Sequence, residues 1–576
     1  MVQTPTYRAL KRVLRRIYPV KVPQPDWQQL LGKDFASWRE ILAGSQTGPQ
    51  ILIATSLGGP GVTMLDSLLA VALRLRGAAV HVLLCDEALP ACEKCGIGEF
   101  TSTKEFLRFG PKRDLCSSCF SQGYEMFSSL GIIVHRYSDF LTENDIRGAK
   151  EVASSVPLDE IGNYSVSGVE VGEHALACAL RFYARGTLDG EENGENVLRQ
   201  YFRGALLTMS AVGKLLERFN YTCASFHNGI YVPQGVVGAV ARRAGVRVVN
   251  WFVAYRKRAF IFSHEDTYHR TLMAEPVSNW ENMAWDEQTE SELLDYLKSR
   301  RGGSRDWISF NRNPEEGLDA IEKELGVDFS LPCVGLLTNV VWDAQLHYPT
   351  NAFPNMLEWL LETIRYFASR SDLQLIIRIH PAEIRGLLPS RQPVLEEIRR
   401  AFPRLPKNVF VISPESPFST YAVMMQCDCV LIYGTKTGVE LTSMGIPVIV
   451  AGEAWIRNKG LTLDAASSED YLKLLDKLPL RYRLGGAMLE RARKYAYHFF
   501  FRRMIPLKSV VPNEGFPVYK LQITALDDLR PTKDIGLDII CNGILHGTEF
   551  IYPAEDNQTR SYAEGSYRGF HAEGNL

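Results

Sequence analysis

The sequence lacks long uncharged apolar runs. No stretch approaches the ~18 to 20 apolar residues that a membrane-spanning helix needs, and the first residues include Arg and Lys where a signal peptide has its apolar stretch. These absences argue against a membrane span and against secretion. We therefore expect a cytoplasmic location.

The sequence also lacks an excess of charge of one sign. Its 64 Lys and Arg residues nearly balance 66 Asp and Glu residues, so no overall field favours nucleic acid as a partner. Cysteine is sparse too, because 11 in 576 residues is far from the density of a disulfide scaffold. An odd number of cysteines also cannot all pair in disulfides within one chain. We expect reduced thiols, some of which hold a metal.

Apolar segments that alternate between strand and helix patterns fill most of the chain, which is too long for one domain. A first series predicts strands at 51–54, 80–84, 132–135, 224–226 and 246–251. A second series predicts strands at 334–338, 373–379, 409–412, 429–432 and 447–450. This alternation predicts an α/β fold with two Rossmann-like, doubly wound domains that face a cleft.

The expected domain organisation follows from these two series. We predict an N-terminal helix and linker, a first Rossmann-like domain for the acceptor, a second for the nucleotide, a crossing helix with a C-terminal segment, and a disordered tail: 1–48, 49–330, 331–480, 481–556 and 557–576. The first segment contains an amphipathic helix at 7–18 with five cations and no anion. This helix either contacts an anionic membrane surface, such as the inner face of the plasma membrane, or docks its apolar face on the protein.

Two matched cysteine pairs lie in a segment of the first domain, 90–122, that reads as an insertion. They are Cys92-x-x-Cys95 and Cys116-x-x-Cys119. Two such pairs predict a zinc knuckle with four sulfur ligands, and a site with no open coordination position is structural. A redox-active disulfide pair is the alternative.

A buried strand of the second domain runs directly into His380-Pro381. The carboxyl ends of parallel strands face the ligand in doubly wound folds. A histidine at this position can donate to a phosphate or to a leaving group. The alternative is a structural histidine at a strand end.

The loop Tyr433-Gly-Thr-Lys-Thr-Gly-Val-Glu440 follows another buried strand of the second domain. It contains residues that suit a nucleotide phosphate, with small residues for close approach, hydroxyls, a cation and a carboxylate for ribose: Gly434, Thr435, Lys436, Thr437, Gly438 and Glu440. The alternative is an ordinary capped turn. Neither of these turns has a GxGxxG or Walker A pattern, so hydride transfer and nucleotide hydrolysis are disfavoured.

These motifs together carry a resemblance to a known family. Arg378-x-His380-Pro381 with Pro414-Glu-Ser416 and the loop of 433–440 resemble the C-terminal half of bacterial capsule-polysaccharide biosynthesis glycosyltransferases, over roughly 331–460. That group includes the β-Kdo transferases and shares its HP motif with sialyltransferase-type GT-B enzymes.

The resemblance implies a GT-B fold in which His380 and the hydroxyls of Thr435 and Thr437 contact the phosphate of an activated sugar, often a CMP-sugar. It adds Arg378 and Ser416 to the nucleotide-binding set. Family members commonly have Ser-Ser or Ser-Thr where this chain has Thr-Lys-Thr. Because Lys436 suits a diphosphate better, the resemblance leaves both CMP- and UDP-linked donors open.

The predicted function is transfer of a sugar from a nucleotide-sugar to a surface or capsular glycan, which includes lipid-linked glycans. Retaining transferases typically have two glutamates eight positions apart. Glu440 has no such partner, because Ile432 and Val448 occupy the positions eight residues before and after it. We therefore expect inversion. A sugar-nucleotide epimerase or hydrolase and a non-catalytic assembly factor are the alternatives.

An inverting transferase also needs a base, which we expect from the first domain. The favoured candidates are Glu173, His174 and His227, and the wider set adds Asp66, Asp86, Glu87 and the segment 263–269.

Overall fold

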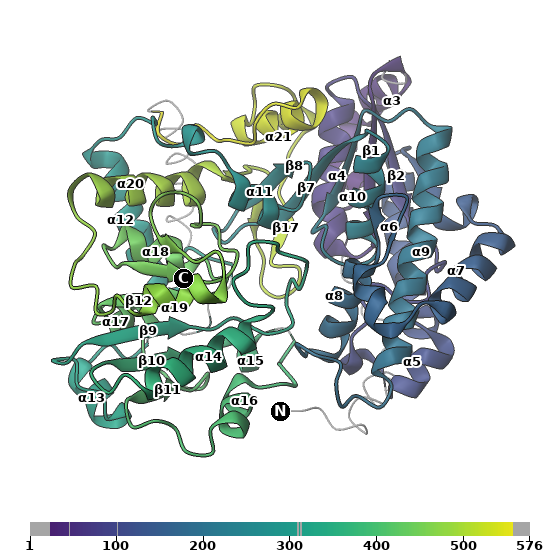
Figure 1. Ribbon diagram of the computed structural model, residues 1–576. Helices are drawn as coiled ribbons and strands as arrows, with labels where there is room; N and C mark the ends of the chain where they lie inside the picture. The colour runs from purple at the N-terminus through teal and green to yellow at the C-terminus, as the bar shows by residue number, and fades with distance from the viewer. Residues whose placement is uncertain are drawn as a thin grey trace.

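The computed structural model describes residues 24–44, 47–100, 102–307, 310, 314–386 and 388–556. The basic segment 7–18 and the tail 557–576 lie outside the described residues. Figure 1 shows two α/β halves, the first in purple to teal on the right and the second in green on the left.

The first half contains a seven-stranded sheet in the order β15-β8-β7-β6-β1-β2-β3. Its five parallel strands are β1 (Gln50–Ser56), β2 (Ala79–Leu84), β3 (Ile133–Arg136), β6 (Cys223–His227) and β7 (Arg247–Val253). Two antiparallel strands extend it, β8 (Ala259–His264) and β15 (Met504–Pro506).

Helices cover both faces of this sheet. Along β1, Ile51 and Ile53 belong to one apolar core, whereas Leu52 and Ala54 belong to a second core on the opposite face. This alternation follows from the two-residue period of a strand. The helices are α4 (Pro60–Arg74), α5 (Thr103–Phe109), α6 (Ser117–Ser129), α7 (Glu143–Ser155), α8 (Gly172–Tyr183), α9 (Gly194–Arg218), α10 (Gln234–Arg243) and α11 (Tyr268–Ala274).

The second half contains a six-stranded parallel sheet in the order β11-β10-β9-β12-β13-β14. Its strands are β9 (Cys333–Leu337), β10 (Gln374–Arg378), β11 (Val409–Ile412), β12 (Cys429–Ile432), β13 (Val448–Val450) and β14 (Leu463–Asp464). In chain order this is 3-2-1-4-5-6, the Rossmann order, and the first five strands of the other sheet run 3-2-1-4-5. The prediction of two Rossmann-like, doubly wound domains is confirmed.

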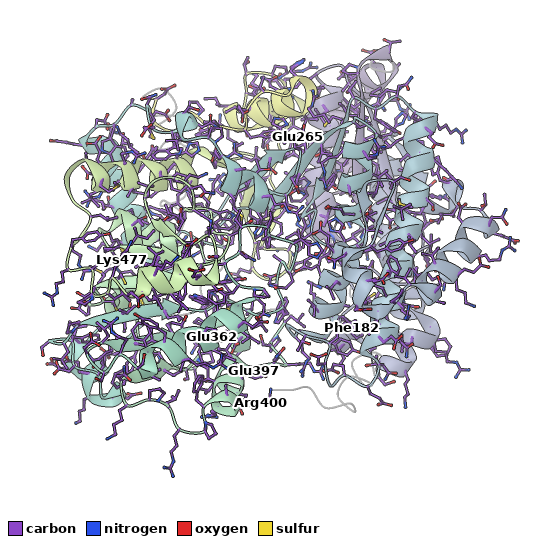
Figure 2. The ribbon with its side chains drawn as sticks, in the orientation of Figure 1. Phe182, Glu265, Glu362, Glu397, Arg400 and Lys477 are labelled. Carbon is purple, nitrogen blue, oxygen red and sulfur yellow. The ribbon has the colours of Figure 1, made fainter. Side chains whose placement is uncertain are left out.

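Helices surround the second sheet as well. They are α13 (Leu318–Leu325), α14 (Met356–Ala368), α15 (Ala382–Arg385), α16 (Val394–Ala401), α17 (Thr420–Met424), α18 (Thr437–Ser443) and α19 (Ser468–Leu475). In Figure 2, Glu362, Glu397 and Arg400 of α14 and α16 lie in the lower part of this half, whereas Phe182 of α8 lies in the other half.

The C-terminal part of the chain connects the two halves. Helix α20 (Gly486–Tyr497) packs against α18 and against α12 (Glu287–Gly302), after which β15 pairs with β8 of the first sheet. Helix α21 (Ile535–His546) then packs on α4, at the top of the view in Figure 1.

Short elements complete the described chain: α2 (Trp27–Leu31), α3 (Phe35–Gly44), β4 (Ser165–Val166), β5 (Val169–Glu170), β16 (Val510–Pro512) and β17 (Tyr519–Leu521). Within the described ranges, no helix combines the length and the apolar character that crossing a membrane requires.

Candidate active site

Three loops meet at the carboxyl edge of the second sheet. Strands β10 and β12 flank β9, so the residues after these strands share one edge. His380 follows β10, Thr338 and Asn339 follow β9, and residues 435–437 follow β12. The strand order reverses between β9 and β12, and open α/β sheets bind their ligands outside such a reversal.

His380 is held in one orientation. Its backbone N–H donates to the hydroxyl of Thr338 at 3.0 Å, and its Nδ1 accepts from the backbone N–H of Ala382 at 3.1 Å. In the neutral ring the proton therefore lies on Nε2. Burial, together with the charges of Lys436 and Arg378, lowers the pKa of His380 to about 4. The side chain is thus a neutral Nε2–H donor near pH 7.

The loop after β12 lies close enough to this histidine for the charge of Lys436 to lower the pKa of His380. Thr435 donates its hydroxyl to Oγ1 of Thr437 at 3.2 Å and accepts from the Thr437 N–H at 3.3 Å. Nearby, Oδ1 of Asn339 is buried, and no described residue donates to it. A polar atom without a partner at this edge is available to a ligand.

The two glycines of the loop have different roles. A methyl group at Gly434 would come within 3.2 Å of the Glu453 carbonyl oxygen and 3.6 Å of the Asn339 amide. At Gly438 it would come within 2.6 Å of Ile432, so this glycine lets α18 pack closely on β12. Gly434 therefore faces the site edge, whereas Gly438 supports the helix.

Glu440 is fully buried in a network of charges. It pairs with Arg300 at 3.1 Å and with Lys436 at 3.1 Å, and it accepts from the hydroxyl of Tyr421. Arg300 also pairs with Asp306. Burial alone would raise the pKa of Glu440, but the charges of Arg300 and Lys436 outweigh burial and lower it. Protein donors thus occupy the carboxylate, and its contact with ribose stays a prediction.

Arg378 and Ser416 belong to the support of the site. The buried guanidinium of Arg378 donates to the carbonyls of Ser413 at 2.5 Å and Ser416 at 3.2 Å. The hydroxyl of Ser416 accepts from the N–H of Phe418 at 3.3 Å. Arg378 therefore holds the loop after β11 in place, and its positive charge lies beneath the site.

The structure encloses the favoured base candidates on α8. Glu173 accepts from Arg270 at 3.0 Å and from the backbone N–H of His347 at 3.0 Å. Burial raises the pKa of Glu173, but the charges of His174 and Arg270 outweigh it, so the pKa lies below its usual value. His174 is 2% exposed, and its Nδ1 donates to the Ile230 carbonyl at 2.6 Å. Glu173 thus ties the first domain to the loop after β9.

His227 is half-buried among aromatic rings, and Asp66 is fully buried. His227 stacks on Phe252 and contacts Trp251 edge-on, and burial lowers its pKa to about 3. Asp66 accepts from Nε1 of Trp251 at 2.9 Å in the core, where burial raises its pKa to about 7.

Several residues at the contact between the halves were not predicted from the sequence. Tyr231 donates to Oδ1 of Asp343 at 2.8 Å, and its oxygen accepts from the Ala344 N–H at 3.1 Å. Nζ of Lys436 lies 4.9 Å from the ring centre of Tyr255. Asp343 lies in the loop after β9, six residues beyond Leu337, whereas His380 lies two residues beyond Arg378 of β10. A strand-end signal therefore points to this loop but not to Asp343 itself.

The two cysteine pairs do not both lie in tight turns, as a zinc knuckle would have them. Cys95 donates its N–H to the Cys92 carbonyl at 2.9 Å in a tight turn, whereas Cys116 ends a π-helical turn and Cys119 lies in α6. Helix α6 lies between β2 and β3 in the chain, so Cys119 belongs to a helix that connects two parallel strands of the first sheet. Cys119 also accepts from the Gly58 N–H at 3.2 Å.

The four thiols do not form a ready metal site. Burial raises the pKa of Cys116, and the charges of Cys92, Cys85 and Cys119 raise it further, so these thiols are neighbours. Within the described part of the chain, however, no three His, Cys, Asp or Glu side chains are arranged to hold a metal ion. Zinc binding stays a prediction that would need the two pairs to shift toward one another.

No protein-family model and no curated protein matches the chain. Among solved structures, the chain is similar to KpsC from Thermosulfurimonas dismutans, a beta Kdo 2,4 transferase, with 14% sequence identity and a TM-score of 0.33. The match covers 54% of this chain and 87% of that chain. A glycosyltransferase from Rickettsia africae ESF-5 matches with 9% identity, 87% of this chain, 100% of that chain and a TM-score of 0.27.

A UDP-GlcNAc 2-epimerase from Neisseria meningitidis, bound to UDP-GlcNAc, matches with 11% identity, 78% of this chain, 94% of that chain and a TM-score of 0.24. Identities and TM-scores this low carry no inference about activity. The chain is a two-domain, Rossmann-like α/β protein, and its function depends on the residues of its own site.

Proposed function

We propose that the chain is a GT-B glycosyltransferase that moves a sugar from a nucleotide-sugar to a hydroxyl of a glycan acceptor, with inversion. The observation that most directly supports this function is the meeting of His380 with residues 435–437 at the strand-order reversal of the second sheet. A neutral ring donor and two hydroxyls at that place suit a phosphate.

The chemistry follows from where charge develops. When the bond between the anomeric carbon and the phosphate oxygen breaks, negative charge builds up on the departing phosphate. Nε2–H of His380 and the hydroxyls of Thr435 and Thr437 can donate to that oxygen. Groups that bind the developing charge more strongly than the ground state raise the turnover rate.

The balance of charge favours a donor with one phosphate. Two cations, Arg300 and Lys436, are matched by two anions, Glu440 and Asp306. His380 is neutral near pH 7 because its pKa is about 4. Arg378, held by carbonyl oxygens, forms no ion pair in the part of the chain that the structure describes. One remaining positive charge suits the single charge of a CMP-linked sugar better than the two of a diphosphate.

The proposal places the acceptor in a surface or capsular glycan, either free or lipid-linked. A lipid-linked acceptor would lie at the inner face of the plasma membrane. The basic segment 7–18 would then contact that anionic surface.

A thermal-shift screen with CMP-, UDP-, GDP- and dTDP-sugars tests the nucleotide site. A ligand at 100 times its dissociation constant stabilises the folded state by about 2.7 kcal/mol. We expect CMP-linked sugars to raise the melting temperature most. If no nucleotide-sugar raises it, the site is not a donor site. If the UDP-linked sugars shift it most, the charge argument is wrong.

A further inference from the structure

One histidine of the first domain reaches the second domain at the candidate site. His269 lies in α11, and its ring centre is 5.4 Å from that of Trp455, which follows β13. Tyr268, its neighbour in the chain, lies 5.8 Å from the same tryptophan ring. The start of α11 therefore packs on a loop at the carboxyl edge of the second sheet.

Trp455 also connects His269 to the candidate phosphate loop. Its ring centre lies 6.0 Å from that of Tyr255, and the Tyr255 ring centre lies 4.9 Å from Nζ of Lys436. Lys436 in turn lies close enough to His380 to lower the pKa of that histidine. His269 is thus separated from the phosphate loop by two aromatic side chains.

The surroundings of His269 suit a group that accepts a proton. The ring is half-buried, and no described residue makes a hydrogen bond with either ring nitrogen. Burial outweighs the charge of Asp343 and lowers the pKa of His269 to about 4, so the ring is neutral near pH 7. Asp343 is exposed and comes from the loop after β9, and its charge acts on the pKa of His269.

The three favoured candidates of the first domain are less suited. Glu173 is engaged by Arg270 and by the backbone of His347. His174 is enclosed, and His227 is packed between aromatic rings. His227 and His269 are both half-buried. Among these candidates, His269 is the one whose ring contacts an aromatic residue of the second domain.

We propose that His269 is the general base of the transfer, an inference that rests on the proposed glycosyltransferase function. The acceptor oxygen forms a bond to the anomeric carbon while the bond from that carbon to the phosphate oxygen breaks. The electron pair of the broken bond leaves with the phosphate at the His380 side. The proton of the acceptor hydroxyl moves to a ring nitrogen of His269 and from there to water. Asp343 is a positioning residue that stabilises the imidazolium.

The test is the steady-state kinetics of His269→Gln with the full-length chain. General bases typically contribute 10²- to 10⁴-fold, so we expect kcat to fall at least ~10²-fold. The KM values of donor and acceptor should change little, because the base acts mainly in the transition state. His546→Gln, at an exposed position at the end of α21, is the matched control and should behave like the wild type.

A second variant, Asp343→Asn, keeps the test decisive if His269→Gln folds poorly. Asparagine retains an oxygen for the Tyr231 hydroxyl at this exposed position. We expect a smaller fall in kcat, ~10-fold, with an unchanged donor KM. Wild-type kcat in both variants, or in Asp343→Asn when His269→Gln is unfolded, would overturn the role of His269.

The two proposals fail in different ways. A wild-type protein that transfers sugar, together with variants that transfer equally fast, removes the base and leaves the glycosyltransferase function standing. A wild-type protein that neither binds nor turns over any nucleotide-sugar removes the function, and the role of His269 with it.

Discussion

Arg300 of α12 pairs with Glu440 of α18 at a distance of 3.1 Å, and both side chains are buried. The pair joins a helix that precedes the second sheet to the helix that follows the candidate phosphate loop. Because Lys436 shares the same carboxylate, the position of the loop depends on this buried network.

Glu440→Gln should destabilise the fold. The substitution leaves Arg300 and Lys436 buried without their shared anion, and removing one partner of a buried ion pair typically costs about 3 to 5 kcal/mol. Urea denaturation measures the loss. Glu362→Gln, which breaks an exposed pair with Arg365 on α14, is the control and should cost less than about 1 kcal/mol. If Glu440→Gln raises only the donor KM and leaves stability intact, the carboxylate serves ribose instead.

His380→Ala should act on turnover more than on donor affinity. Removing one donor to a developing oxyanion typically costs ~10² to 10³ in kcat, about 2.7 to 4 kcal/mol of transition-state stabilisation. We therefore expect kcat to fall by that order while the donor KM changes less. Initial-rate kinetics with each accepted donor check this expectation. Near-wild-type transfer by the variant would mean that His380 is structural.

Elemental analysis decides the prediction of zinc. We expect one equivalent in protein purified without chelator, held by Cys92, Cys95, Cys116 and Cys119. Cys92→Ser should lose the metal and lower the melting temperature, whereas Cys541→Ser, at a cysteine within α21, should keep the metal. Less than about half an equivalent in the wild type would count against the site.

The raised pKa of Asp66 should make the free energy of unfolding depend on pH. Burial raises its pKa to about 7 in the folded state, above the value of about 3.9 expected when unfolded. The folded state therefore binds an extra proton between these pH values, and the stability falls as pH rises through that window.

Asp66→Asn removes this dependence while it preserves an acceptor for Trp251. We expect the variant to exceed the wild type by about 1 kcal/mol near pH 4.5 and by up to about 4 kcal/mol at pH 8. Chemical denaturation at the two pH values measures the difference. The same pH curve for variant and wild type would show that the carboxyl group titrates normally.

Local signals predicted most of the fold. The expected strands at 409–412 and 429–432 match β11 and β12, because a strand buried in a parallel sheet is a short apolar run between turn residues. Local signals also placed His380 and residues 435–437 at the same sheet edge. The antiparallel strands β8 and β15 were not predicted. Strand β15 is short, contains a proline, and pairs with a strand far away in the sequence, so no local pattern indicates it.

The partners of the site residues could not be predicted in the same way. Nothing near Glu440 in the sequence indicates that Arg300 occupies its carboxylate, and nothing near Glu173 indicates Arg270. Likewise, nothing near His269 in the sequence indicates that its ring contacts Trp455 of the second domain. Long-range packing determines which ionisable groups are occupied and which are free.

Product analysis of the full-length chain tests the central claim most directly. CMP-, UDP-, GDP- and dTDP-sugars are incubated with and without oligosaccharide acceptors, and the products are followed by mass spectrometry and by NMR of the anomeric centre. The account predicts an acceptor extended by one sugar with inverted configuration, free nucleotide in equal amount, and loss of both in His380→Ala. An epimerised or hydrolysed donor that forms equally well without acceptor, or no turnover of any donor, would contradict it.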